Sequence, residues 1–318
     1  MLSICIPIYN VNITNLVQDL AKQVKKETIP FEIILIDDCS LEIFKKQNEA
    51  VCVKENYIKL DENIGRAKIR NKFLAYANYD NLLFLDCDST IIADNYIANY
   101  ITEIQKKPNY DVFFGGSIYT KKPPIRKKML RWKYGIQKES QTVENRKKTP
   151  NKSFMTNNFL INKRVFKKVR FDERITEYGH EDTLFGYMLK KNKYKVEHID
   201  NAVLNENIED NNIYLEKTEK SIKNLISIVK YVNHDNELIK NISILNFHKK
   251  IETRKLSKTI YILFRLSKST LKYFFTKGYV NLKLFDFYKL GILITNYKKQ
   301  KVLNQNSTEK SKLDRVQV

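Results

Sequence analysis

The 318-residue sequence is poor in cysteine and glycine, and both shortages exclude classes of protein. Its four cysteines (Cys5, Cys39, Cys52, Cys87) form no Cys-x-x-Cys pair, which disfavours a disulfide framework or a zinc site and favours a reducing compartment. Only eight glycines occur, and neither the Gly-x-Gly-x-x-Gly nor the Gly-x-x-x-x-Gly-Lys phosphate-binding pattern is present. A dinucleotide-binding Rossmann enzyme and a P-loop NTPase are therefore disfavoured.

Long apolar runs are also missing. No stretch reaches the roughly 18 uninterrupted apolar residues of a membrane-spanning helix. The first apolar run, residues 2–9, has neither a basic lead-in nor a cleavage site and does not match a signal peptide. With 42 % hydrophobic residues the chain can still bury a core, and its length suits a large catalytic domain with an appendage, or two domains.

The net charge of +21 is concentrated in two segments. Residues 119–170 carry a net +15 and residues 241–318 a net +13, while the rest of the chain is mildly acidic. The total points first to nucleic acid or an anionic membrane. The uneven distribution instead predicts two local positive surfaces on a protein that is not uniformly basic.

Short apolar strands alternate with helical patterns through the first half, and everything from about residue 216 is predicted to be helical. Strands that alternate with helices indicate parallel βαβ units in an open sheet covered on both faces. The predicted strands are 3–8, 31–36, 82–85 and 158–161, and the predicted helices are 16–24, 67–77 and 181–190.

Three predicted strands end in polar residues, and in open α/β sheets ligands bind beyond the carboxyl ends of the strands. Asp86 and Asp88 follow a buried strand at alternate positions, so both carboxylates can face one divalent cation such as Mg²⁺ or Mn²⁺. An isolated Asp-x-Asp pattern is more often a cap or a turn. Its position beside two further polar strand ends, Tyr9-Asn10 and Asp37-Asp38, favours a metal-binding site.

Six short motifs, in order and spacing over about residues 1–210, resemble the family 2 glycosyltransferases of GT-A fold. The resemblance implies an α/β fold with a mostly parallel open sheet flanked by helices. It also implies an inverting transfer of a sugar from a nucleotide-sugar donor to an acceptor hydroxyl, assisted by Mg²⁺ or Mn²⁺. The motifs are Ile6-Pro7-Ile8-Tyr9-Asn10, Ile36-Asp37-Asp38-Cys39-Ser40, Asn63-Ile64-Gly65-Arg66-Ala67 with Arg70-Asn71, Phe84-Leu85-Asp86-Cys87-Asp88, Thr156-Asn157-Asn158 and Gly179-His180-Glu181-Asp182.

The resemblance also implies a role for each matching residue. Asp88 is the implied metal ligand at the diphosphate, and Asp86 the ribose or metal-side acid. Asp182 is the implied general base, with Glu181 as substitute; as an alternative, both acids suit the start of a helix. The residues implied to line the nucleotide-sugar site are Pro7, Tyr9, Asn10, Asp38, Gly65, Arg66, Arg70, Asp86, Asn157 and Asn158.

The same motifs indicate which base the donor carries, and the sequence differs from the usual family pattern at two positions. Asp38 would accept a hydrogen bond from a uracil-type imide and Tyr9 would stack on the ring, which favours a UDP-linked sugar. Cys39 replaces a usual Gly or Ser. Asn205 stands where many family members place a histidine near the metal, and Asn is a weaker ligand without positive charge.

Three regions are expected: a catalytic domain over residues 1–215, a basic amphipathic helical region over 216–298 and a flexible tail over 299–318. The helical region mixes lysines with large apolar side chains, which favours an anionic membrane surface; the alternative is packing on the catalytic domain. We expect a cytoplasmic enzyme, peripheral at the inner face of the membrane. It would build surface polysaccharide on a glycan or lipid-linked saccharide acceptor.

The basic segment 119–170 is expected to form either a flap that meets the donor diphosphate or an anionic acceptor, or a solvated loop. Three other functions are alternatives. A nucleic-acid-binding protein fits the total charge but lacks a recognised motif. A nucleotidyltransferase would need a glycine-rich phosphate loop. A catalytically impaired scaffold is the alternative raised by Asn205.

Overall fold

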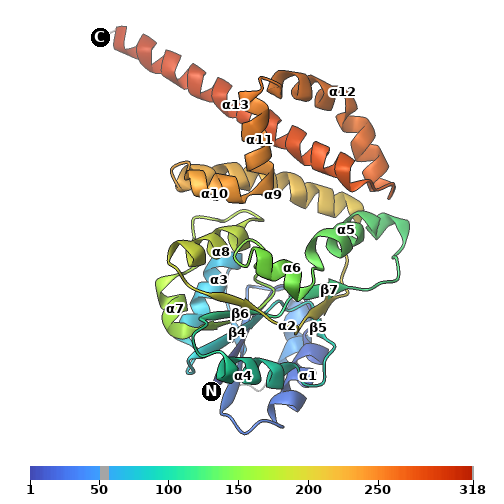
Figure 1. The fold of residues 1–318 in the computed structure, drawn as a ribbon, viewed down its shortest axis with the longest axis vertical. Helices are drawn as coiled ribbons and strands as arrows, with labels where there is room; N and C mark the ends of the chain where they lie inside the picture. Colours follow the sequence, from blue (N-terminus) through green and yellow to red (C-terminus); the bar gives the residue numbers. More distant parts are fainter. Residues whose placement is uncertain (51–56, 317–318) are drawn as a thin grey trace. The chain divides into compact units, whose positions relative to one another are not determined.

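The computed structural model describes residues 1–50 and 57–316, with side chains up to residue 300, so Cys52 lies outside it (Figure 1). The chain divides into two compact units. The sheet unit comprises Met1–Pro124, Tyr134–Thr176 and Glu181–Ile208. The helical unit comprises Ile125–Lys133, Glu177–His180 and Glu209–Val318. The expected boundary near residue 215 lies close to this division, but two short segments from earlier in the chain belong to the helical unit.

A seven-stranded sheet of order β3-β2-β1-β4-β8-β6-β9 forms the centre of the sheet unit. Every neighbouring pair is parallel except those of β8, which runs antiparallel to β4 and to β6. The predicted mostly parallel α/β sheet is therefore confirmed. The strands are β1 (Leu2–Ile8), β2 (Phe31–Asp37), β3 (Tyr57–Lys59), β4 (Asn81–Leu85), β6 (Val112–Phe114), β8 (Asn158–Asn162) and β9 (Val196–His198).

The strand sequences are continuously apolar because both faces of the sheet are covered. Side chains alternate between the faces along a strand, so Ile4 and Ile6 of β1 pack in one core and Cys5 packs in the other. Helices α1 (Thr14–Val24) and α4 (Tyr96–Lys106) cover the first core. The second core is covered by α3 (Arg66–Lys72), the 3₁₀ turn η1 (Phe73–Ala75), α7 (Lys163–Lys168) and α8 (Glu181–Lys191).

A second, three-stranded sheet was not predicted. It consists of β5 (Ser89–Ile91), β10 (Val203–Asn205) and β7 (Ser117–Tyr119). β10 pairs antiparallel with β5, and the register places Asn205 opposite Ser89, the residue after Asp88. Strands of three residues show no periodicity of their own, which explains why the sequence does not reveal them.

The remaining helices of the sheet unit are short. They are α2 (Glu42–Glu49), the π-helical turn η3 (Gly135–Glu139) and α6 (Val143–Lys148).

The helical unit is built around buried aromatic side chains. Phe264 and Phe275 of α12 pack edge-on against Tyr288 of α13, with ring centroids 5.6 and 5.8 Å apart. The turn η2 (Arg126–Lys128) and helix α5 (Met129–Tyr134) begin in this unit, and Asn211 binds them through Leu130 N–H and the Arg126 carbonyl. The long helices are α9 (Asn211–Tyr231), α10 (Asn236–Asn241), α11 (Ser243–Thr253), α12 (Ser257–Thr276) and α13 (Leu282–Val316).

Helix α13 continues to Val316, within the segment 299–318 that was expected to be a flexible tail. Lys and Gln, which favour helix, recur there and are consistent with the continuation. Among the described residues, no helix combines the length and the apolar content that crossing a membrane requires.

Candidate active site

The end of β2 holds the first cluster of predicted site residues. Asp38 is buried, and its two carboxylate oxygens accept hydrogen bonds from the backbone N–H groups of Ile64 (2.7 Å) and Gly65 (3.0 Å). Burial raises the pKa of Asp38, although these two hydrogen bonds oppose the rise. Asp38 therefore positions the loop before α3, in addition to any contact with a donor base.

Gly65 adopts a backbone conformation that favours glycine. Its φ of 82° and ψ of 169° lie in a region that side chains rarely tolerate, and a Cβ at this position would meet no atom within 4 Å. Glycine is therefore favoured here by its backbone dihedral angles, and not because a side chain would collide with neighbouring atoms. Open space lies next to this turn, as expected where the chain passes a ligand.

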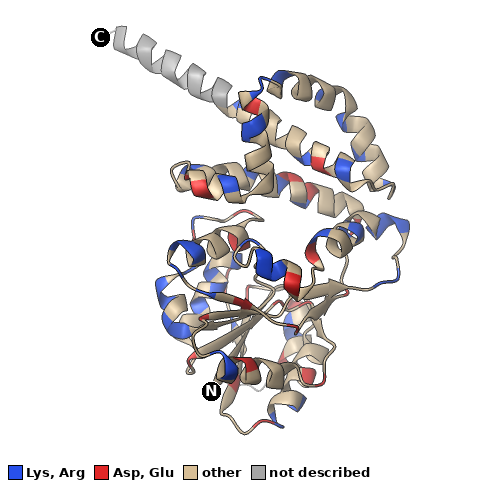
Figure 2. Ribbon diagram, in the orientation of Figure 1, with Lys and Arg blue, Asp and Glu red and all other residues tan. Residues whose placement is uncertain are grey.

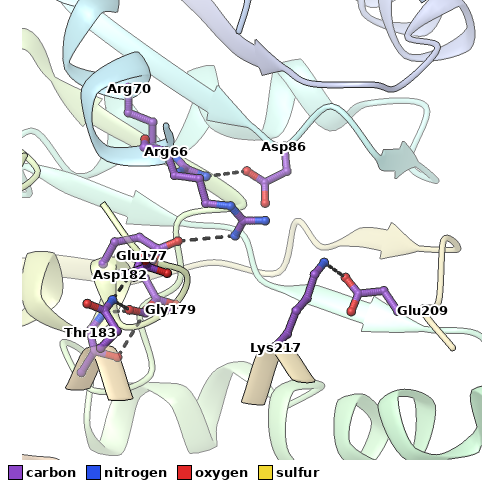
Figure 3. Close-up of polar contacts among 11 residues, drawn as sticks. Arg66, Arg70, Asp86, Glu177, Gly179, Asp182, Thr183, Glu209 and Lys217 are labelled. Atoms are coloured by element: carbon purple, nitrogen blue, oxygen red, sulfur yellow. Dashed lines mark hydrogen bonds and ion pairs between the residues drawn. The ribbon is translucent and has the colours of Figure 1, made fainter. Parts of the chain in front are cut away.

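Two arginines of α3 link the predicted acids. Arg70 is only 4 % exposed, and its Nη2 donates to Asp86 Oδ1 at 2.8 Å. One turn earlier, Arg66 Nη1 lies 3.4 Å from Glu181 Oε1 at the start of α8 (Figure 3). The helix thus joins the end of β4 to the start of α8. Four predicted site residues, distant in sequence, are brought together by these two ion pairs.

Glu181 and Asp182 have pKa values shifted in opposite directions. Burial alone would raise the pKa of Glu181, but the charges of Arg66 and Arg70 outweigh it and the pKa falls. Burial, followed by the negative charge of Glu181, raises the pKa of Asp182 to about 6. Asp182 Oδ1 accepts from Thr183 N–H at 2.6 Å. A carboxylate with such a pKa accepts a proton more readily than an ordinary one, as a general base must.

Two buried acceptors at the site have no protein donor. Glu181 Oε2 and Asn157 Oδ1 are both buried without a hydrogen-bond partner. Asn157 belongs to the same cluster, because its carbonyl accepts from Asp86 N–H at 3.1 Å. Unpaired buried acceptors are costly in a folded protein, and hydroxyl groups of a bound ligand would satisfy them.

Asn158 does not fit its predicted role as a ligand-lining residue. It is fully buried, and its Oδ1 accepts from Tyr96 (2.6 Å) and Tyr100 (2.7 Å). Its Nδ2 donates to the carbonyls of Gly116 and Asn201, each at 2.8 Å. These contacts connect β8 to neighbouring segments and use the whole side-chain amide, so Asn158 has a structural role.

Three residues predicted to bind the donor lie at the end of β1 and in the turn that follows it. Tyr9 is 52 % exposed, which leaves its ring accessible for stacking, and Pro7 is half-buried within β1. Asn10 adopts a left-handed φ of 54° and closes the turn by accepting from Leu41 N–H at 2.8 Å. These three residues remain predictions for donor binding.

The Asp-x-Asp end of β4 is compatible with a divalent cation. Among the described residues no three His, Cys, Asp or Glu side chains come together as a metal-binding group. Asp86 pairs with Arg70. Asp88 is exposed and precedes Ser89, the residue paired with Asn205. Mg²⁺ and Mn²⁺ are commonly held by one or two carboxylates together with substrate phosphates. Asp88, an exposed carboxylate at this turn, fits that mode of binding.

The loop before α8 is held by residues that sequence reasoning missed. Asn224 of α9 is buried and donates to the carbonyls of Gly179 (2.6 Å) and Glu177 (3.1 Å). Gly179 has a φ of 100°, and a Cβ there would lie 2.4 Å from Ser221 Oγ. His180 follows with a φ of 69°. No local signal in α9 indicates this contact, because the two segments are more than 40 residues apart.

The basic segment 119–170 is not simply a flap or a solvated loop. Arg146 is buried and donates to the carbonyls of Phe114 (3.1 Å) and Ile199 (3.0 Å), and Lys147 pairs with Glu197 at 2.8 Å. Lys133 donates to the carbonyl of Val280 inside the helical unit. At least these three cations stabilise the fold.

Comparison with known proteins identifies the class of molecule. The family model described as glycosyl transferase family 2 matches residues 3–170, more than half of the chain. The chain belongs to glycosyl transferase family 2. As a member of this family it is a glycosyltransferase that takes its sugar from a nucleotide-sugar donor. No curated protein matches this glycosyltransferase.

Solved structures share the fold of this glycosyltransferase. The mannosyltransferase PcManGT from Pyrobaculum calidifontis, in complex with GDP-Man and Mn²⁺, aligns with a TM-score of 0.53 at 11 % identity over 93 % of this chain and 86 % of that one. TarS 1–349 of S. aureus in complex with UDP aligns with a TM-score of 0.50 at 20 % identity over 96 % and 91 %. At these identities the likeness establishes the GT-A fold alone.

Proposed function

We propose that this glycosyltransferase inverts the configuration of the transferred sugar and uses Asp182 as its general base. The observation that supports this most directly is the position of Asp182 at the start of α8 beside Glu181, where burial and the charge of Glu181 raise its pKa to about 6. At neutral pH such a group is ionised and still basic enough to accept a proton. Glu181, with its lowered pKa, stays ionised and pairs with Arg66.

In the proposed reaction the acceptor hydroxyl loses its proton to Asp182. The resulting oxygen attacks the anomeric carbon on the face opposite the diphosphate, so one carbon–oxygen bond forms as the other breaks. The nucleoside diphosphate leaves with the bonding electron pair. Like glycoside hydrolysis, this transfer passes through an oxocarbenium-like sugar. Asn157 Oδ1 and Glu181 Oε2, buried without a hydrogen-bond partner, would be the acceptors for sugar hydroxyls.

Asp88 would hold a Mg²⁺ or Mn²⁺ ion, with Asn205 opposite the following residue, Ser89. Bound there, the ion would neutralise charge that develops on the leaving diphosphate. Asp86 contributes less to such an ion, because Arg70 already compensates its charge. PcManGT was solved with Mn²⁺, which makes this ion the natural first choice.

We take a UDP-linked sugar as the donor and a hydroxyl of a glycan or lipid-linked saccharide as the acceptor. Exposed Tyr9 supports stacking on a base, and the structure of TarS with UDP makes uridine the first base to test. The enzyme would act as a peripheral protein at the inner face of the cell membrane, in surface polysaccharide synthesis. Neither the nucleic-acid-binding nor the nucleotidyltransferase alternative has a structural observation in its favour.

Donor hydrolysis with a panel of nucleotide sugars and Mn²⁺ tests the proposal. UDP-sugars should be hydrolysed, and both Asp88→Ala and Asp182→Ala should lower the rate by about 100-fold or more. Asp19→Ala, which removes an exposed acid of α1, is the matched control and should keep full activity. Undiminished activity of either site variant would refute that site assignment. If no donor is hydrolysed but thermal shift shows UDP binding, the impaired-scaffold alternative gains support.

A further inference from the structure

Helix α12 has a second apolar face that its own unit does not use. Phe264, Leu271 and Phe275 are buried and provide the packing against the rest of the helical unit. On the other side five large apolar residues are exposed, and the most exposed of them, Leu266, is 77 % accessible. The set, called here the outer face of α12, consists of Ile262, Leu263, Leu266, Tyr273 and Phe274.

The outer face forms two adjoining rows of apolar side chains, interrupted by Ser269 and Thr270 between Leu266 and Tyr273. At about 100° per residue, Ile262, Leu266 and Tyr273 fall within about 40° of one another, and Leu263 and Phe274 form a parallel row. Ile262, Leu266 and Tyr273 lie on the side opposite Phe264 and Phe275, and Leu263 and Phe274 lie between the two sides. Apolar side chains exposed singly are common, but an exposed row along one helix marks an interaction surface.

Positive charge borders these apolar rows. Lys258, Arg265 and Lys272 recur every seven residues, are all exposed and form a row along one edge of the outer face. Residues 253–285 contain eight Lys or Arg and no Asp or Glu. Figure 2 shows α12 with basic but no acidic residues. No acidic residue within 253–285 therefore neutralises the lysines and arginines that border the apolar residues.

Aromatic rings and cations meet at the C-terminal end of the same helix. Phe274 lies edge-on to Tyr273 (5.9 Å) and to Tyr279 (6.0 Å). The guanidinium of Arg126 stacks 5.2 Å from the Tyr279 ring and donates to its hydroxyl at 3.1 Å. Lys277 Nζ lies 5.9 Å from the Tyr273 ring. Tyrosines beside cations are typical of the headgroup layer of a bilayer.

We infer that the outer face of α12 is the docking surface for an anionic lipid bilayer. Its apolar rows would enter the boundary of the acyl chains, and Lys258, Arg265 and Lys272 would lie at the headgroups. A second copy of the chain fits less well, because a symmetric pair would bring two uncompensated cationic rows together. Nucleic acid fits less well, because exposed Ile262, Leu263 and Leu266 offer it no contact. This inference rests on the proposed peripheral location and not on the catalytic residues.

Co-sedimentation of the full chain with vesicles tests the surface. We expect binding to vesicles that contain phosphatidylglycerol, little binding to phosphatidylcholine alone, and weakening by salt. The triple variant Lys258→Gln, Arg265→Gln, Lys272→Gln should lose on the order of 100-fold in affinity. Ile262→Ser with Leu266→Ser, at exposed positions that leave the core intact, should lose about tenfold or more. The control Lys22→Gln, Lys106→Gln, Lys167→Gln removes the same charge from exposed sites of the sheet unit and should bind normally.

Several results would overturn the inference. They are unchanged binding by both α12 variants, no binding of the wild type to anionic vesicles, a self-association abolished by Leu266→Ser, or a DNA affinity lost in the triple variant. Donor hydrolysis without vesicles separates this inference from the proposed chemistry. The α12 variants should keep the wild-type rate in solution, whereas Asp182→Ala should lose the rate and still bind vesicles.

Discussion

Arg70 Nη2 and Asp86 Oδ1 lie 2.8 Å apart at the centre of the site, and the arginine is almost completely buried. The charge of the same guanidinium also lowers the pKa values of Glu181 and Asp182. One side chain therefore compensates three acids that come from two different elements. Its loss would leave an acidic cluster without its principal cation.

Replacement of Arg70 by Met should destabilise the protein by about 2 kcal/mol, because Asp86 and Glu181 lose a buried partner. Arg70→Lys keeps the charge but not the planar pair of donors and should lose about half as much. Urea unfolding measures both values. Equal stability of Arg70→Met and the wild type would show that the pair contributes nothing to folding.

Activity should rise with pH through about 6 and reach a plateau above it. Asp182 must be ionised to accept a proton, and its pKa is raised to about 6. Arg70→Met should shift the midpoint to higher pH. The positive charge of Arg70 favours the ionised form of Asp182, so its loss should raise the pKa of Asp182 further. A profile of kcat/KM against pH measures both effects. Asp19→Asn should not move the midpoint, and a flat profile between pH 5 and 8 would argue against Asp182 as the base.

Asp182→Asn should be more stable than the wild type at pH 8 by about 1–2 kcal/mol, although it loses activity. Since the folded-state pKa of Asp182 is raised above its ordinary value of 3.8, the stability this group contributes is complete below about pH 4. It is lost as the pH rises through about 6. The difference in stability between Asp182→Asn and the wild type should therefore vanish near pH 4. Thermal unfolding at pH 4 and pH 8 measures this difference. A difference that does not depend on pH would contradict the assigned pKa.

Asn205→His should increase affinity for Mn²⁺ by about tenfold. The register of β10 and β5 places residue 205 opposite Ser89, one residue along the chain from Asp88, and imidazole is a stronger ligand than a neutral amide. Titration of activity with Mn²⁺ measures the concentration at half-maximal rate. In an Asp88→Ala background the histidine should give no gain, and a gain there would place the ion elsewhere.

Asn224→Ala should lower kcat by about tenfold or more while donor affinity changes little. Its two hydrogen bonds hold the loop that leads into Glu181 and Asp182, and small displacements of a catalytic group are costly. Gly179→Ala should be at least as harmful, because its Cβ would collide with Ser221. Lys223→Ala, at an exposed neighbour on α9, is the matched control. Calorimetry of UDP binding separates lost chemistry from lost binding, and a normal kcat for Asn224→Ala would show that the loop needs no such support.

Much of the sheet could be predicted because its signal is local. Ile4, Cys5 and Ile6 are all apolar, which indicates a strand buried on both faces, and the acids at the ends of β2 and β4 mark the ligand edge. The three short strands of the second sheet escaped because each pairs only with distant segments.

Sequence alone determined the family, the class of fold and the acids placed at one edge of the sheet. These follow from local periodicity and from motifs of a few adjacent residues. Tertiary structure decided which of those residues have a structural role, such as buried Asn158, and which distant groups support the site, such as Asn224. It also divided the apolar residues of α12 into a buried and an exposed face. The physical reason is that burial and hydrogen-bond partners depend on packing between segments far apart in the chain, which no local pattern records.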